Sequence, residues 1–359
     1  MSLSPTLWEP FTLGSLSLPH RLALAPMTRN RADADGTPTA LAAEYYAQRA
    51  SLGLLITEGT QPSADGQGYL NTPGIHTPEH IAGWKGVTDA VHQAGGHVFI
   101  QLMHVGRLSH PDNTPHHRQS VAPSAISAEQ DFFTPTGMQS TPTPRALATD
   151  EIGGIVAEFV HAARSAIEAG ADGVEIHGAN GYLLHQFLAP NANERTDEYG
   201  GSVEHRSRIV VEVATAVADA IGPERTGIRI SPGFPLGGLD EGGPDAIRAQ
   251  YRHLVGELAP LNLAYLHVHH AGDDELLRSL RDLWPTALLV VRYGRDRDQI
   301  ADDVEAGLAD IAPLGRWALA NPDVVERLRL DAPLNQVDPD TLYAGGPRGY
   351  TDYPTLASA

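Results

Sequence analysis

A short polar segment, HGANGY, begins at His177 and holds three side chains that could act on one substrate. If the chain turns helically after the apolar run GVEI, His177 and Asn180 share a face, with Tyr182 close by. His and Asn can both donate hydrogen bonds, so the pair could hold a carbonyl oxygen that gains negative charge during reaction. Tyr182 could then act as a general acid, a contribution of about 10²–10⁴-fold. The alternative is a polar cluster that caps a helix.

Polar or small residues also follow other short apolar runs of the chain. Examples are Thr28, Glu58, Gly59, Gln101, Arg229 and Ser231. In a parallel barrel the carboxyl ends of all strands meet at one mouth. Several converging polar groups therefore indicate a lined pocket.

Two of these strand ends pair a glycine with an arginine. Gly294 and Arg295 follow the seventh apolar run, and Gly315 and Arg316 follow the eighth. Barrel enzymes often bind a phosphate at this place, since glycine permits close approach and arginine offers a two-pronged hydrogen-bond donor. We therefore predict that a phosphate binds here. Neither metal-ligand spacing nor a Ser-His-Asp signature is present, so we expect the phosphate to belong to a bound cofactor or substrate. The alternative is two ordinary turns with solvated arginines.

The elements that must position these groups are eight short apolar runs. They begin at Arg21, Leu52, His97, Gly173, Thr226, Leu263, Ala287 and Asp310. Segments with apolar residues at spacings of three and four lie between most of them, including 80–96, 151–170, 205–222 and 247–260. This alternation predicts an α/β fold, a (β/α)₈ TIM barrel. An open doubly wound sheet is the alternative, weakened because no G-x-G-x-x-G follows the first run.

One connection is unlike the others. Residues 107 to about 145 are rich in Pro, Ser and Thr and too long for an ordinary loop. After the third strand, this insert is either a lid over the barrel mouth or a partly disordered segment. We expect residues 1–359 to form a single barrel domain, with an N-terminal cap ahead of the first strand.

Composition excludes several classes of protein. The chain has no cysteine, so it has no disulfide, no thiol nucleophile and no iron–sulfur cluster held by thiolates. The formal net charge of −19 would repel nucleic acid and gives no basic membrane-binding patch. The N-terminal residues resemble no signal peptide, and no run is long enough to span a membrane. We expect a cytoplasmic protein.

Longer motifs, matched in order along essentially the whole chain, resemble the Old Yellow Enzyme family of FMN-dependent ene-reductases. The resemblance is to the bacterial branch that includes N-ethylmaleimide and pentaerythritol tetranitrate reductases. The motifs include LALAPMTRNR, QLMHVGR, ADGVEIHGANGYLLHQFLAPNANERTDEYGGSVEHR, GIRISP and LGRWALANPDVVERL. The resemblance implies a barrel that binds FMN tightly but not covalently at its mouth.

The resemblance also implies roles for individual residues. Pro26, Met27, Thr28 and Gly59 would lie at the flavin, and Gln101 and Arg229 at its pyrimidine side. Gly294, Arg295, Gly315 and Arg316 would hold the phosphate. His177 and Asn180 would bind the activating group of the substrate, Tyr182 would donate the proton, and Tyr69 and Tyr343 would line the substrate pocket.

The implied reaction has two halves. NADPH, or NADH, would transfer hydride to flavin N5 and leave, and an activated alkene would then enter. Hydride would pass from N5 to the β-carbon while Tyr182 protonates the α-carbon. The implied substrates are enones, enals and maleimides, with nitro compounds or nitrate esters as further candidates. We expect a monomer or a weak dimer.

Three residues depart from the family pattern. Met103 stands where many relatives carry tryptophan, which puts substrate orientation and stereochemical outcome in doubt. Gly59 replaces a common alanine, and Tyr293 precedes Gly294 where a smaller residue is usual.

Composition and missing motifs bear on three other functions. The absence of cysteine opposes a larger relative with an iron–sulfur cluster, and missing ligands oppose a metal-dependent barrel hydrolase. An FMN-binding sensor or storage protein without alkene turnover is the remaining alternative.

Overall fold

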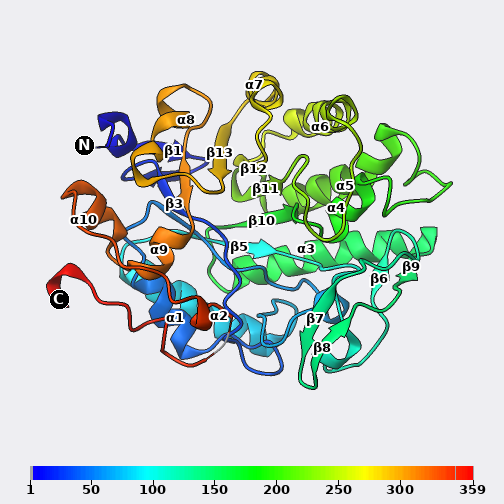
Figure 1. The fold of residues 1–359 in the computed structure, drawn as a ribbon, viewed down its shortest axis with the longest axis horizontal. Coiled ribbons are helices and arrows are strands. Elements are labelled where there is room, and N and C mark those ends of the chain that lie inside the picture. The colour runs from blue at the N-terminus through cyan, green and yellow to red at the C-terminus, as the bar shows by residue number, and fades with distance from the viewer. Residues whose placement is uncertain (1–2, 344, 359) are drawn as a thin grey trace.

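The computed structural model of the chain describes residues 3–343 and 345–358. Eight parallel strands pair in the order β13-β12-β11-β10-β5-β4-β3-β14. A bridge between Leu289 and Ile311 joins the two outer strands and closes the barrel. Figure 1 shows β5, β10, β11, β12 and β13 near the centre of the molecule, with helices outside them. The strands are β3 (Leu22–Leu24), β4 (Leu54–Ile56), β5 (Val98–Leu102), β10 (Gly173–Gly178), β11 (Thr226–Ile230), β12 (Tyr265–His270), β13 (Ala287–Arg292) and β14 (Ala312–Leu314). Each lies within a predicted apolar run, so the TIM barrel is confirmed.

Helices pack around this barrel. They are α1 (Ala40–Ala47), α2 (Pro78–Gln93), α3 (Ile152–Glu168), α4 (Leu183–Leu188), α5 (Val203–Ile221), α6 (Pro244–Leu258), α7 (Asp274–Leu283), α8 (Asp302–Glu305), α9 (Arg316–Ala320) and α10 (Val324–Arg329). The four predicted helical segments correspond to α2, α3, α5 and α6. α2 begins before its apolar pattern does, because the side chain of Thr77 caps it and a proline occupies its first turn. No helix in the described residues is long and apolar enough to cross a membrane.

The N-terminal cap is a hairpin of β1 (Phe11–Leu13) and β2 (Leu16–Leu18). Leu13 and Leu18 are buried in the same apolar cluster as Ala264 and Ala287, at or just before the starts of β12 and β13. The hairpin therefore covers the amino-terminal end of the barrel. The hairpin leaves the carboxyl ends of the strands uncovered, and a functional site can form there.

The insert (residues 107–145) is held by its own strands. β6 (Val121–Ala122) pairs with β9 (Arg145–Ala146), and β7 (Asp131–Thr134) forms a hairpin with β8 (Gly137–Ser140). Phe132 of this hairpin stacks on Tyr69, with ring centroids 5.0 Å apart. The insert is thus attached to the segment that carries Tyr69.

A C-terminal strap (residues 338–343 and 345–354) returns to the barrel. Two buried arginines after β3 hold it through its backbone carbonyls. Arg29 Nη2 donates to Gly349 O at 2.8 Å, and Arg31 Nη2 donates to Thr341 O at 2.8 Å. The strap carries Tyr343.

Candidate active site

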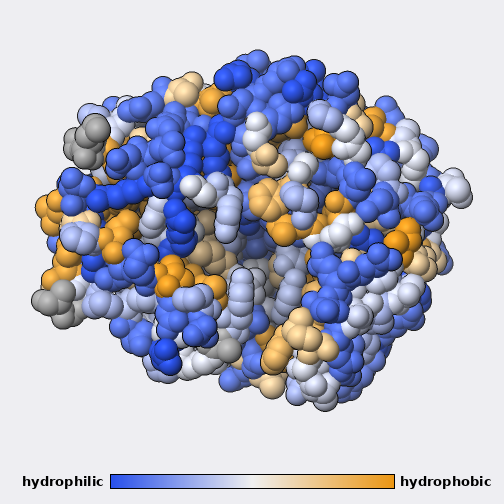
Figure 2. All heavy atoms as spheres, in the orientation of Figure 1, coloured by the Kyte–Doolittle hydropathy of each residue, from blue (hydrophilic) through white to orange (hydrophobic). Residues whose placement is uncertain are grey.

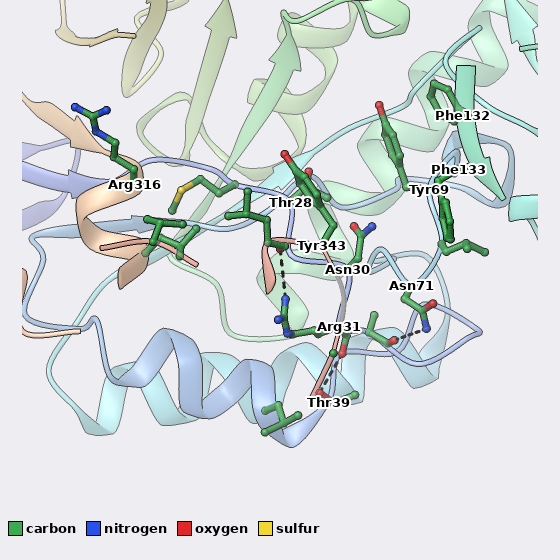
Figure 3. Close-up of a pocket in the computed structure, with 18 of the residues that line it drawn as sticks. Thr28, Asn30, Arg31, Thr39, Tyr69, Asn71, Phe132, Phe133, Arg316 and Tyr343 are labelled. Carbon is green, nitrogen blue, oxygen red and sulfur yellow. Dashed lines mark hydrogen bonds between the residues drawn. The ribbon is translucent and has the colours of Figure 1, made fainter. Parts of the chain in front are cut away.

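A cavity of about 1580 Å³ opens at the carboxyl ends of the strands. Figure 2 shows the hollow near the centre of this face, and Figure 3 shows part of its lining. Its walls come from the loop after β3, the insert and the C-terminal strap. Six predicted site residues line it: Met27, Thr28, Tyr69, Tyr182, Arg316 and Tyr343. The others lie outside that lining set: Pro26, Gly59, Gln101, His177, Asn180, Arg229, Gly294, Arg295 and Gly315.

The segment after β10 differs from the predicted helical turn. Asn180 and Gly181 have positive φ values of 56° and 86°, and helix α4 begins only at Leu183. A Cβ at position 181 would lie 2.7 Å from Gly237 Cα, so glycine is required by both conformation and space. The expectation that His177 and Asn180 share a helical face is therefore wrong. They are joined by a left-handed turn instead.

Ser231, one of the polar strand ends, and His185, which no sequence signal indicated, hold this turn. Asn180 N donates to Ser231 Oγ at 2.8 Å, and Gly181 N donates to His185 Nδ1 at 3.0 Å. The other ring nitrogen of His185 lies 3.2 Å from Glu241 Oε1. Both His185 and Glu241 are buried. Ser231 follows β11, so its place at a strand end was a usable signal, whereas His185 and Glu241 lie in segments with no such signal.

His177 is a neutral hydrogen-bond donor. Its Nδ1 accepts from Ala179 N at 3.2 Å, which leaves the ring proton on Nε2. Burial, together with the charge of Arg229, lowers the pKa of His177 well below its usual value. Its ring lies edge-on to Tyr182, with centroids 5.0 Å apart.

Asn180 is already partly engaged. Its Nδ2 lies 2.9 Å from Nδ1 of His269, a ring whose pKa burial lowers to about 3. The neutral His269 nitrogen accepts, so Asn180 keeps one amide hydrogen for another partner. Its Oδ1 is buried without a hydrogen-bond partner among the residues that the structure describes. The side chain thus has unused hydrogen-bonding capacity.

Tyr182 faces the cavity from the end of this turn. Its hydroxyl lies 3.2 Å from that of Tyr69, which stacks on Phe132 as Figure 3 shows. Burial raises the pKa of Tyr182, so the phenol is protonated at neutral pH. The arrangement can supply a proton to a molecule in the cavity.

A second polar group lies on the strands themselves. Gln101 on β5 pairs in register with Glu175 on β10, and His177 pairs with Arg229 on β11, which pairs in turn with His267 on β12. We name Gln101, Glu175, Arg229 and His267 the floor of the site. Glu175 was not assigned to the site from the sequence, although a carboxylate inside an apolar run is a signal.

The hydrogen-bonding groups of the floor determine which ring system it can hold. Nε of Arg229 is buried and has no hydrogen-bond partner within the described part of the chain. A buried arginine without a partner calls for an acceptor, because leaving its donors unmade is costly. Gln101 has one side-chain oxygen to offer beside that donor. A donor next to an acceptor fits the pyrimidine edge of a flavin, where an N–H lies between two carbonyls.

Only part of the predicted phosphate-binding set has side chains available to a ligand. Gly294 has a φ of 79°, and Gly315 caps the short helix α9. Arg316 Nη2 donates to Arg295 O at 3.0 Å, and Arg295 Nη1 lies 2.9 Å from Asp303 Oδ2. Arg316 thus remains the exposed cation at the cavity, while Arg295 is engaged in an ion pair.

Two of the departures from the family pattern are in contact. A Cβ built on Gly59 would lie 2.4 Å from Met103 Sδ. Met103 therefore occupies the space that an alanine methyl group would need. The third departure, Tyr293, is 88% exposed and lines the cavity.

The next feature is the possibility of a metal site. Within residues 3–343 and 345–358, no group of three or more His, Cys, Asp or Glu side chains could hold a metal ion.

Comparisons with known proteins agree with this geometry. The sequence profile of the NADH:flavin oxidoreductase / NADH oxidase family matches residues 6–335. A probable flavin mononucleotide-dependent alkene reductase of Leishmania infantum is 41% identical over 357 residues, covering 97% of each chain. Morphinone reductase, solved with tetrahydroNAD, is 45% identical, with a TM-score of 0.93 and 98% of each chain covered. An Old Yellow Enzyme homologue of Zymomonas mobilis is 37% identical, with a TM-score of 0.93, over 98% of this chain and 100% of that one.

Proposed function

This chain belongs to the NADH:flavin oxidoreductase / NADH oxidase family, and we propose that it is an FMN-dependent reductase of activated C=C bonds. NADPH or NADH supplies the hydride. The substrates are enones, enals and maleimides, with nitro compounds and nitrate esters as further candidates. One observation carries the proposal: the protonated hydroxyl of Tyr182 faces the cavity, with the neutral ring of His177 against it.

FMN, when bound, would supply the hydride-transfer chemistry that links the nicotinamide to the β-carbon of the alkene. The chain supplies binding, orientation and the proton. His177 Nε2 and the remaining amide hydrogen of Asn180 hold the activating oxygen of the substrate. These donors are oriented before the reaction, so they stabilise charge that develops on that oxygen. Tyr182 donates its proton to the α-carbon.

The cofactor residues in this proposal are those predicted from the sequence. Gln101 and Arg229 hold the pyrimidine edge, supported by the unpartnered Nε of Arg229. The remaining ring contacts are Pro26, Met27, Thr28 and Gly59. The phosphate contacts are Gly294, Arg295, Gly315 and Arg316. Tyr69 and Tyr343 are the side walls of the substrate pocket, supported by their place in the cavity lining.

The wider setting is proposed with the activity. Residues 1–359 act as a single FMN-binding barrel domain in the cytoplasm, as a monomer or a weak dimer. Nucleic acid and membranes are not partners, which the net charge of −19 supports. Light scattering on a size-exclusion column checks the oligomeric state.

The test separates the two half-reactions. We expect the purified protein to be yellow, to be bleached by NADPH or NADH without oxygen, and to regain its colour with cyclohexenone or N-ethylmaleimide. Stopped-flow absorbance follows each step, and comparing both nicotinamides identifies the donor.

Two outcomes oppose the proposal. A colourless protein that FMN cannot reconstitute contradicts the whole function. A protein that NADPH bleaches but that no activated alkene reoxidises supports the FMN-binding sensor or storage protein instead.

A further inference from the structure

Glu175 is a fully buried carboxylate in the middle of β10, with 0% of its surface exposed. Each carboxylate oxygen has its own partner on a different strand. Oε1 accepts from Gln101 Nε2 at 2.7 Å, and Oε2 accepts from His267 Nδ1 at 2.8 Å. Burying a charged side chain inside the barrel is costly unless it is paired. The roles proposed above give this carboxylate no function.

The charge state of Glu175 follows from its neighbours. Burial alone would raise its pKa, but His267, Arg229 and Gln101 together lower the pKa below its usual value. The group is therefore a carboxylate at neutral pH. A carboxylate can only accept hydrogen bonds.

This acceptor-only character decides how the Gln101 amide is turned. Gln101 must present Nε2 to Glu175, so its carbonyl oxygen is the group left for a ligand. The two ends of an amide have nearly the same shape, so packing alone does not choose between them. The hydrogen bond to Glu175 makes the choice.

We propose that Glu175 is a positioning residue for the flavin, which fixes the Gln101 carbonyl toward the ring N–H and offsets the charge of Arg229 beneath the pyrimidine edge. The inference rests on the proposed placement of that edge at Gln101 and Arg229. It assigns Glu175 two measurable effects: tighter FMN binding and a lower reduction potential. The potential is lower because a buried negative charge opposes the negative charge that reduction adds to the ring.

The first test is Glu175→Gln, measured with FMN bound and without turnover. The new amide removes the charge, and it can turn its own N–H toward Gln101. Gln101 would then reverse and oppose the ring N–H with a donor. We expect FMN affinity to fall at least tenfold by fluorescence titration. We also expect the reduction equilibrium, read against a reference dye, to shift at least tenfold toward reduced flavin, about 30 mV for a two-electron couple.

The second variant separates the effect of the negative charge from the effect of side-chain length. Glu175→Asp keeps the carboxylate but is one methylene shorter, so it cannot contact both Gln101 and His267 as now. We expect weaker FMN binding with a potential close to that of the wild type. This variant also serves if Glu175→Gln does not fold.

The matched control is Glu241→Gln. Glu241 is also a buried carboxylate paired with a buried histidine, His185, but it lies behind the turn rather than in the floor. We expect its potential to equal that of the wild type.

The inference is overturned if both Glu175 variants bind FMN within twofold of the wild type, or if Glu241→Gln shifts the potential as far as Glu175→Gln. If the wild-type protein binds no FMN, the proposed function fails and this inference with it. If the wild type reduces alkenes while the Glu175 variants are unchanged, only this inference fails.

Discussion

The floor and the rim of the site are built differently. The floor residues, Gln101, Glu175, Arg229 and His267, lie on four adjacent strands, and each is at most 7% exposed. The rim, which we define as Phe133, Tyr293 and Tyr343, lies outside the barrel strands, with Phe133 on β7 of the insert, and is 67%, 88% and 62% exposed. Hydrogen bonds between neighbouring strands fix the positions of the floor residues. The positions of the rim residues depend on the segments outside the barrel strands.

This difference matches the two tasks of the proposed reaction. A flavin needs the same contacts in every turnover, so buried strands suit it. Substrates and nicotinamide enter and leave by turns, so exposed aromatic side chains at the entrance suit them. Tyr182 stands between the two regions, on a turn held from below by His185 and Ser231.

The largest expected effect is at this junction. Tyr182→Phe removes the proton donor and should slow reoxidation by cyclohexenone about 10²–10⁴-fold. Reduction by NADPH needs no proton from this hydroxyl, so it should be nearly unchanged. Stopped-flow measurement of both half-reactions on the same preparation provides the control. Equal losses of rate in both half-reactions would show that Tyr182 has a structural role and is not the proton donor.

The next effect concerns Glu58, which holds the backbone at Arg29, one of the two arginines that bind the strap. Glu58 Oε2 accepts from the backbone N–H groups of Arg29 and Asn30 at 2.9 and 3.2 Å. Burial raises the pKa of Glu58 from 4.5 to about 7. The folded protein therefore retains a proton that the unfolded chain releases, and this stabilisation is lost as pH rises from 4.5 through about 7.

Glu58→Gln should abolish that pH dependence. Across this interval the free energy of unfolding of the wild type should fall by up to about 3 kcal/mol relative to the variant. Urea unfolding of both proteins at several pH values measures the difference. Parallel curves for the two proteins would mean that the pKa of Glu58 is the same in the folded and the unfolded protein.

A smaller effect tests how tightly the site beside the floor is packed. Gly59→Ala would place a methyl group 2.4 Å from Met103 Sδ, so the flexible thioether must turn away, at a cost of about 1 kcal/mol. In a Met103→Ala background the same methyl group should cost nothing or stabilise, because it fills part of the space that the shortened side chain leaves. Thermal and urea unfolding of the two single variants and the double variant give the coupling energy.

Gly86→Ala is the matched control for this cycle. Gly86 lies in α2 and a Cβ there meets nothing within 4 Å, so the substitution should be neutral or stabilising. Additive effects of the Gly59 and Met103 variants would contradict the contact.

The smallest effect should separate two neighbours on the insert. Phe132 is 7% exposed and stacks on Tyr69, whereas Phe133 is 67% exposed. Phe132→Ala should raise the KM for the alkene up to about tenfold, since a stacked aromatic pair contributes about 0.5–1.5 kcal/mol. Phe133→Ala should change KM about twofold or less, in keeping with its exposure. Steady-state kinetics with cyclohexenone measure both, and equal shifts would mean that the insert acts as one flexible unit.

The place of several predicted residues around the cavity was predictable, because a barrel converts strand order into spatial order. Thr28, Tyr182 and Arg316 line the cavity as expected from their places after strands. The turn at Asn180 was predicted wrongly, because its shape depends on the close approach of Gly181 to Gly237. His185 and Glu241 were missed for the same reason, since their contacts join segments distant in the chain.

By itself, the sequence determined the barrel, the strands that form it and the polar residues at their ends. Periodicity and order along the chain encode these features, because each buried strand and each amphipathic helix must show its own pattern. Only the tertiary structure decided which side chains meet. The contact of Gln101, Glu175 and His267 depends on the register of strands that barrel closure brings together, and the fit of Met103 against Gly59 depends on a shared space. Neither register nor shared space is a property of any single segment.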